Sequence, residues 1–435
     1  MKRLQLHHVI AWLLLVVMGL IVFHAPMTVF VASRWSGIGD IVKAWKEILI
    51  LVALGLLVVA YARERRWSSL RRDAIVWTAG LYAALHLMSV ATFPAQFQAA
   101  IAGLMIDLRY IAYFVAVYTF LKLYPVYRHS FLKLALWSAY FVVGFAVIQL
   151  ILPHDFLKYV GYGDATIQPY LTVDKNPDYV RLQSTMRGPN PLGAYAVIVL
   201  AGVLSYLRVK RRDTRQLRVL ALGLAAAVAL WCSFSRSAVI GFIVVVGILA
   251  WSLRGQLTRR RQLAVVIGIV GIASLMVVAL QGTSFWHNVV VHDNPTTGAS
   301  IDSNQGHADS LRDGLARMAV QPLGAGVGST GSASLYTDSP LIIENQYLFI
   351  AHEVGWMGLT VFLGFSTLVL RRLWRQRDDW KSYALFASGI ALMMIGLMQP
   401  VWADDTVSLV WWGLAGVLYG MKGEGDGTTT NKKAA

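Results

Sequence analysis

The chain has 435 residues, of which 57% are hydrophobic and 14% are charged, with a net charge of +16. A soluble globular domain carries roughly 25% charged residues, and one membrane-spanning helix needs about 20 apolar residues. This composition excludes a soluble enzyme and predicts a protein that crosses a membrane many times. Cys232 is the single cysteine, which excludes an intramolecular disulfide and a metal site built on cysteine.

Apolar runs bounded by charged residues, Pro or Gly predict an all-α polytopic membrane protein with about twelve transmembrane helices. We expect spans near 9–32, 47–62, 74–94, 101–121, 132–153, 190–207, 219–234, 237–253, 263–281, 346–370, 382–400 and 407–421. The first run follows Met1-Lys2-Arg3 without a small-residue cleavage site, which indicates a retained helix. Residues 1–421 would form one membrane domain, and residues 422–435 a disordered cytoplasmic tail.

The positions of Lys and Arg predict the orientation, because these residues concentrate in cytoplasmic connections. Of the 39, 27 lie in the alternate set of connections that includes both termini, ten lie in the opposite set, and Arg109 and Lys133 lie inside spans. Both termini are therefore expected in the cytoplasm, and the positive charge is explained without a nucleic-acid partner. The cytoplasmic connections are too short for a nucleotide-binding domain, so we expect function on the long outer connections 154–189 and 282–345.

Two arginines stand where predicted spans meet the outer face. Arg187 precedes Gly188-Pro189-Asn190-Pro191, which breaks the backbone at the membrane, and it could contact lipid phosphate or hold a bound diphosphate. Arg236 lies in the tight connection Ser233–Ser237, where an arginine is costly unless it is paired or solvated. Asp107 and Arg109, deeper in the fourth span, are expected in an internal structural ion pair.

The second long outer connection predicts a helix that lies on the membrane interface. Leu311, Leu315 and Met318 repeat at i, i+4 and i+7, which gives an apolar stripe. Arg312 and His307 lie off that stripe, where they could be solvated or functional.

Gly326, Gly328 and Gly331 match the spacing G-x-G-x-x-G, but a dinucleotide site also needs a strand before this motif and a helix after it. No strand pattern precedes it, so we expect a flexible turn or a nest of backbone amides that binds an anion. The spacing of His287, His292, Asp293 and His307 is too irregular for a metal site.

Two carboxylates flank the start of the tenth predicted span. Glu344 lies where the loop meets the membrane, and Glu353 lies two to three turns deeper. A carboxylate at this boundary, near several arginines, could act as a general base or as a structural partner for an arginine.

Four segments, taken in chain order, resemble the O-antigen ligase and O-antigen polymerase superfamily of bacterial envelope glycosyltransferases. They are Arg187-Gly188-Pro189-Asn190-Pro191, Ser235-Arg236, Arg312 followed by Pro322-Leu323-Gly324-Ala325-Gly326, and Glu344-Asn345 with Gly355 and Gly358. The resemblance runs from about residue 120 to residue 370. Each motif is weak alone, but the ordered set on a twelve-span scaffold is specific.

One position departs from the ligase pattern of that superfamily. The ligase branch has His, then Asn, Ser or Gln, then nine residues, Gly, two more residues, and Gly, Thr or Tyr. Asn345, Gly355 and Gly358 keep this spacing, but Glu344 stands at the histidine position. A carboxylate can accept a proton as imidazole does, so polymerases and oligosaccharyltransferase-like relatives stay open beside ligases.

The resemblance implies a transfer that needs neither metal nor cofactor, on the outer face of the cytoplasmic membrane of a bacterium. An oligosaccharide would move from a polyprenyl diphosphate carrier to a hydroxyl of a glycan or glycolipid. Fixed guanidinium groups would stabilise the leaving diphosphate, and the helix near 309–318 would act as a lid. The residues expected in these roles are Glu344 as base, Asn345 orienting it, Arg312 in catalysis, and Arg187, Arg236, Arg181 and Arg317 on the diphosphate.

Two alternatives remain open at this point. A polysaccharide or lipid-linked sugar flippase could share the plan of twelve spans with both termini inside, but transporters place polar sites near mid-membrane. Here the polar residues gather on the outer face, which favours the enzyme. The second alternative is a non-catalytic assembly subunit that kept the fold and lost the histidine.

Overall fold

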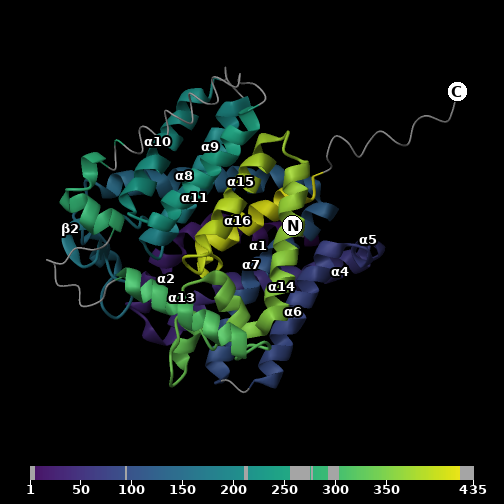
Figure 1. The fold of residues 1–435 in the computed structure, drawn as a ribbon. Coiled ribbons are helices and arrows are strands. Elements are labelled where there is room, and N and C mark those ends of the chain that lie inside the picture. The colour runs from purple at the N-terminus through teal and green to yellow at the C-terminus, as the bar shows by residue number, and fades with distance from the viewer. Residues whose placement is uncertain are drawn as a thin grey trace.

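The computed structural model describes residues 5–93, 96–209, 214–254, 275, 278–291 and 303–421. Its long helices form one bundle (Figure 1). They are α1 (Leu6–Leu20), α2 (His24–Ala32), α4 (Trp45–Arg63), α6 (Ala74–Thr92), α7 (Phe97–Leu123), α8 (Arg128–Gln149), α9 (Pro189–Val209), α10 (Gln216–Cys232), α11 (Arg236–Leu253), α13 (Ser303–Val320), α14 (Gln346–Arg375), α15 (Trp380–Ile395) and α16 (Asp405–Tyr419).

Shorter elements connect these helices. They are α3 (Gly39–Lys43), α5 (Ser68–Arg71), the 3-10 turns η1 (Ile21–Phe23), η2 (Ser36–Ile38), η3 (Pro125–Tyr127), η4 (Phe156–Val160), η7 (Gly331–Tyr336) and η8 (Val401–Ala403), the π-turn η6 (Trp286–Val291), and the strands β1 (Leu171–Val173) and β2 (Asn176–Arg181).

The protein is a polytopic membrane protein. Among the described residues, eight helical segments are long and apolar enough to cross a membrane, and α10 and α15 are shorter apolar helices. The predicted spans coincide with helices along the described chain, the first of them with α1 and α2 together, whereas the predicted span 263–281 lies largely outside the described residues. Large apolar side chains such as Trp77, Trp137 and Trp251 are 62–65% exposed, which suits surfaces that face lipid.

The bundle has two groups of helices that meet at α16. Helices α9, α10, α11 and α15 pack together, α6 packs on α14, and α7 packs along α16. In Figure 1 the first group lies on one side of α16, and α4 and α6 lie on the other. At Gly413 and Gly416 of α16, an added Cβ would overlap Tyr113 or lie 2.8 Å from the Phe114 carbonyl oxygen of α7, so glycine allows this close approach.

Aromatic rings fill the space between α7, α14 and α16. Trp412 stacks on Tyr110 at 5.8 Å between ring centroids and meets Phe114 edge-on at 5.9 Å. Phe365 of α14 lies 5.2 Å from Trp412. Such pairs add to the stabilisation from burial alone, and they fix the helices whose outer ends carry the polar residues described below.

The outer connections contain more regular structure than the sequence predicted. Strands β1 and β2 form an antiparallel hairpin in the first long loop, with Leu171 opposite Arg181. The expected all-α fold therefore needs one small correction. β-Branched and apolar residues on either side of a turn at Asp174 and Lys175, both with positive φ, favour this hairpin. The helix predicted in the second loop is present as α13, and its place on the membrane interface stays a prediction.

Candidate active site

Two helix N-termini lie side by side at the end of the bundle that the sequence predicts to face outward, called the outer end below. Helix α9 begins at Pro189 and α11 begins at Arg236. A Cβ on Gly193 would lie 2.7 Å from the Cβ of Ala238 and 3.0 Å from that of Ser235, so the first turns of the two helices touch. Because a helix N-terminus carries a partial positive charge, two adjacent N-termini favour a bound anion.

Arg181 ties these two helix starts together. Its Nε donates to the Ser233 carbonyl oxygen at 2.9 Å, and its Nη2 donates to Asn190 Oδ1 at 2.6 Å. Burial, together with the nearby charge of Arg236, lowers the pKa of the Arg181 guanidinium to about 10, although Asp174 opposes this shift. Arg181 thus stays charged at neutral pH while its hydrogen bonds hold protein groups. We interpret it as a positioning residue for the hairpin that carries Arg236.

Arg236 is a half-buried cation at the first position of α11, where the helix dipole alone would disfavour it. Its charge acts on Arg181, on Asp174 and on His307. The β1–β2 hairpin and α13, which are distant in sequence, therefore both lie near Arg236.

The most direct contact between distant segments joins His307 to Glu344. The Nδ1 atom of His307, on α13, pairs with the Oε2 atom of Glu344, just before α14. The two side chains are 47% and 43% exposed. The hydrogen bond to Glu344 raises the pKa of His307, whereas burial and the charge of Arg236 oppose that increase.

The start of α14 is fixed by the three residues that follow Glu344. Asn345 caps the helix, its Oδ1 accepting from the amides of Tyr347 and Leu348 at 2.9 and 3.1 Å. Its Nδ2 donates to the Leu397 carbonyl oxygen at 2.9 Å, and Gln346 Oε1 accepts from the Trp402 amide at 2.8 Å. The hydrogen bonds of Asn345 therefore serve the backbone, and the partner of the Glu344 carboxylate is His307.

Helix α13 places its two predicted arginines apart from this pair. Arg317 Nε pairs with Asp313 Oδ2 at 2.8 Å, one turn back on the same helix. Arg312 is exposed, and within the described part of the chain its guanidinium makes no hydrogen bond or ion pair. Gly314 is the residue of α13 that packs on α14, where its Cβ would lie 2.9 Å from Leu348. At about 100° per residue, Arg312 lies on the opposite side of α13 from Gly314.

The same helix keeps an apolar stripe away from the bundle. Leu311 and Leu315 are 43% and 53% exposed, whereas Met318 packs partly against the core. The exposed leucines suit contact with the apolar edge of a membrane interface. The expectation that α13 acts as a lid stays a prediction.

Arg187, just before α9, is exposed at the outer end of the bundle. Its Nη2 lies 3.5 Å from Ser332 Oγ in η7, and its charge acts on Asp404 ahead of α16. The segment before α9 therefore faces both the second outer loop and the start of α16. Arg187 and Arg236 lie at two adjoining helix starts, which Arg181 of β2 connects. The structure does not bring Arg312 or Arg317 to these helix starts.

The glycine-rich segment after α13 binds a carboxyl group of the protein itself. The amide of Gly328 donates to Glu353 Oε1 at 3.0 Å, and Gly324, Gly326, Gly328 and Gly331 all have positive φ. A carboxylate of α14 thus occupies the predicted nest of amides. Glu353 is only 1% exposed, and its surroundings assign it a structural role.

The segment also inserts at a kink in α14. Gly355 has φ 71° and ψ −173°, which interrupts the helix. The Trp356 amide donates to the Pro322 carbonyl oxygen at 3.0 Å, and the Ala325 amide donates to the His352 carbonyl oxygen at 2.6 Å. The conformation of Gly355 explains why glycine stands at this motif position.

Asp107 and Arg109 are both buried and contact other residues rather than each other. Arg109 pairs with Asp405 of α16 and with Glu47 of α4 at 3.5 Å, whereas Asp107 lies 3.7 Å from His86 of α6. These contacts connect α7 to three neighbouring helices. Arg109 is thus in a buried ion pair, as expected, but Asp107 is not its partner.

The described residues hold no group of three or more His, Cys, Asp or Glu side chains placed for a metal ion. His292 and Asp293, considered above as possible ligands, lie outside the described residues. Sequence reasoning missed His307 as the partner of Glu344, because the two are far apart in the chain. The signal available was that both lie on outer segments next to proposed site residues.

Comparison with known proteins gives a relative that covers nearly the whole chain. No protein-family model matches. The chain is 21% identical over 390 residues to a protein named O-antigen polymerase from Salmonella muenchen, which covers 86% of this chain and 94% of that protein. This distant similarity supports the resemblance to the O-antigen polymerase and ligase superfamily.

Proposed function

We propose that this protein is a membrane glycosyltransferase of the O-antigen polymerase type. It would extend a glycan on the outer face of a bacterial cytoplasmic membrane by moving an oligosaccharide from a polyprenyl diphosphate carrier to a hydroxyl of an acceptor glycan. The name of the relative supports polymerisation over ligation to a separate glycolipid. The observation that carries the proposal is the Glu344–His307 pair within range of the Arg236 charge.

In the proposed reaction, the acceptor hydroxyl oxygen attacks the anomeric carbon of the sugar attached to the carrier. The bond from that carbon to the diphosphate oxygen breaks, and the hydroxyl proton passes to Glu344. A base must lie within hydrogen-bond reach of the hydroxyl, and the exposure of Glu344 leaves its carboxylate accessible.

His307 gives Glu344 a property that a lone surface carboxylate lacks. A bare glutamate has a pKa near 4.3 and is a weak base at neutral pH. The hydrogen bond to Glu344 raises the pKa of the His307 imidazole, so His307 can take up the proton that the carboxylate receives. The ligase pattern has a histidine at the position of Glu344. In this protein, His307 of α13 would provide the imidazole instead.

The diphosphate is proposed to lie against the starts of α9 and α11. Arg187 and Arg236 would contact it, and the two helix dipoles add to their field without rearrangement during the reaction. Arg181 would hold this arrangement rather than bind the diphosphate directly. Arg312 would meet the substrate from α13 only when that helix changes its position, and Arg317 would act through Asp313.

Transfer in proteoliposomes tests the proposal. Purified protein would receive a radiolabelled polyprenyl-diphosphate oligosaccharide, with the wild type beside Glu344→Gln. We expect longer carrier-linked glycans from the wild type and a loss of roughly 100-fold or more in the variant, the range for removing a general base.

Asp338→Asn is the matched control, because Asp338 is an exposed carboxylate on the same outer loop. It should retain the wild-type rate. Full activity of Glu344→Gln would remove Glu344 from the mechanism. Label crossing the bilayer without any new glycan would show a transporter instead.

A further inference from the structure

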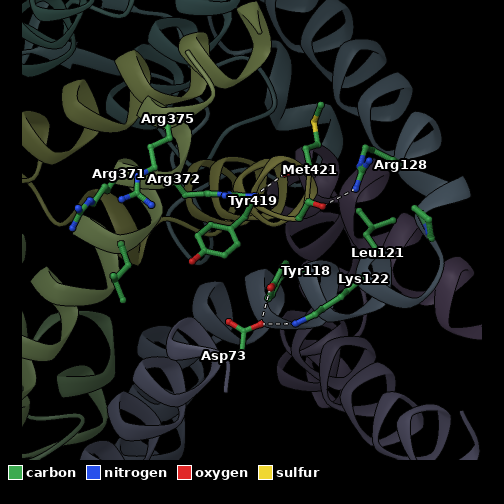
Figure 2. Close-up of a pocket in the computed structure, with 13 residues that line it drawn as sticks. Asp73, Tyr118, Leu121, Lys122, Arg128, Arg371, Arg372, Arg375, Tyr419 and Met421 are labelled. Atoms are coloured by element: carbon green, nitrogen blue, oxygen red, sulfur yellow. Dashed lines mark hydrogen bonds and ion pairs between the residues drawn. The ribbon is translucent and has the colours of Figure 1, made fainter. Parts of the chain in front are cut away.

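A second polar site lies at the other end of the bundle from Glu344. A cavity of about 810 Å³ opens among the ends of α7, α14 and α16 and the start of α8 (Figure 2). Five basic side chains line it, against one acidic side chain, Asp73. They are Lys122, Arg128, Arg371, Arg372 and Arg375.

Part of this charge is already satisfied by the protein. Lys122 Nζ pairs with Asp73 Oδ2 at 2.7 Å, and the Tyr118 hydroxyl donates to the same oxygen at 2.7 Å. Arg372 Nη2 donates to the Met421 carbonyl oxygen at 2.9 Å. These contacts, drawn as dashed lines in Figure 2, close the α7 and α16 sides of the cavity. The acidic residue is therefore fully engaged with Lys122 and Tyr118.

Three groups that line the cavity lack an acceptor. Arg371 and Arg375 are exposed and lie one turn apart on α14, and neither guanidinium makes a hydrogen bond or ion pair within the described ranges. Arg128 donates through Nη2 to the Gly420 carbonyl oxygen at 3.2 Å, but its Nε is buried without a partner. A buried donor without an acceptor is costly and calls for an explanation. An anion in the cavity would supply one.

Apolar side chains complete the lining. Leu121, Leu368 and Met421 lie beside the cations, at the depth where α7 and α14 end. Basic pockets between helices at a membrane surface recognise phosphate headgroups of anionic lipids. A lipid meets both parts of this lining, because its phosphate can reach the guanidinium groups while its glycerol and first carbons lie on the leucines.

We propose that this cavity binds the phosphate headgroup of an anionic membrane lipid, between Arg371 and Arg375 on one side and Arg128 on the other. The site is separate from the outer-face residues and does not depend on the reaction proposed for them. The bound lipid would lie between the end of α14 and the start of α8, on opposite sides of the cavity, and would connect these two helices.

Lipid binding by the full-length protein in detergent tests the proposal. Native mass spectrometry would follow titration with phosphatidylglycerol and, separately, with phosphatidylcholine. The variant is Arg371→Gln/Arg375→Gln. The matched control is Arg63→Gln/Arg66→Gln, which removes two exposed charges at the same end of the bundle and outside the cavity. Size-exclusion chromatography would verify that each variant is folded.

We expect the wild type to prefer phosphatidylglycerol and the cavity variant to bind it at least about tenfold more weakly, with the control unchanged. An equal loss in the control, or no loss in the cavity variant, would overturn the proposal. Glycerol 1-phosphate serves as a soluble competitor. If it displaced the lipid at equal concentration, the phosphate site would stand and its natural ligand would be a soluble phosphate, which overturns the lipid assignment.

Discussion

Glu344 and Glu353 lie nine residues apart at the outer part of α14, yet their surroundings differ. Glu344 is 43% exposed and pairs with a histidine from α13. Glu353 is 1% exposed and accepts the Gly328 amide at 3.0 Å. A proton can reach the first from an external hydroxyl, whereas the second is enclosed by the protein. The difference shows that position along a helix near the membrane does not by itself identify a base; access does.

The largest loss of stability is expected from a change at Gly328, whose amide binds the enclosed carboxyl group of Glu353. Gly328 has φ 87°, and an added Cβ would collide with the Ala99 carbonyl group. Gly328→Ala should therefore displace the amide that holds Glu353 and destabilise the fold by roughly 3 kcal/mol or more. Thermal unfolding in detergent measures this. Gly364→Ala, at a glycine with open space around it, is the control and should unfold near the wild-type temperature.

Exchanging each carboxylate for its amide compares the two positions directly. Glu344→Gln should lose transfer while unfolding at the wild-type temperature. Glu353→Gln should do the reverse, with lower stability by about 1–3 kcal/mol because a buried acceptor is altered, and with normal transfer per folded molecule. Activity measured beside the melting temperature separates the two. The comparison would fail if Glu353→Gln abolished transfer without lowering stability.

The pH dependence sharpens the role of the exposed pair. The pKa of His307 is raised above its ordinary value of 6.5 by Glu344. The ion pair is thus complete below 6.5 and is lost as the pH rises through the raised value. Only after His307 has released its proton does the pair accept another, so the transfer rate should rise with pH through a midpoint above 6.5.

His307→Gln should remove that rise from the pH–rate profile and slow transfer at neutral pH by roughly tenfold, because Glu344 alone is a weaker base. His154→Gln, an exposed histidine in the first outer loop, is the control. An unchanged profile in His307→Gln would mean that Glu344 works without its partner.

The smallest effect is expected at Arg317. Its ion pair with Asp313 is exposed, at 38% and 54% for the two side chains, and such pairs contribute about 0.2–1 kcal/mol. Arg317→Gln should therefore shift the melting temperature slightly and leave the Michaelis constant for the carrier unchanged. A large rise in that constant would show that Arg317 leaves Asp313 to bind the diphosphate, as the sequence analysis proposed.

The sequence predicted the repetitive parts of the structure well, because each span and the helix at 303–320 carry their own periodic signal. It did not predict which residues meet. Glu344 finds its partner on another helix, and Arg109 finds Asp405 at the far end of the chain. Such contacts depend on how helices pack, which no local pattern encodes.

The local roles of some motif residues were also beyond the sequence. Asn345 follows a candidate base, which suggested an orienting role, but the same position is the N-cap of α14, where an asparagine is favoured for its own reason. The hairpin of β1 and β2 went unnoticed because its strands are short. At Asn345, one residue type is compatible with two roles, and only the backbone conformation decides between them.

The kink at Gly355 sets a limit on the length of the chain next to it. The Pro322 carbonyl oxygen accepts from the Trp356 amide, and the Ala325 amide donates to the His352 carbonyl oxygen. These two hydrogen bonds lie on either side of the interruption of α14. Residues 322–325 therefore connect the two parts of α14 across the kink, and the number of residues between the two hydrogen bonds is fixed. Insertion or deletion of one residue there would put both hydrogen bonds out of register at once. This short stretch of an outer loop should tolerate changes in length as poorly as the interior of a helix.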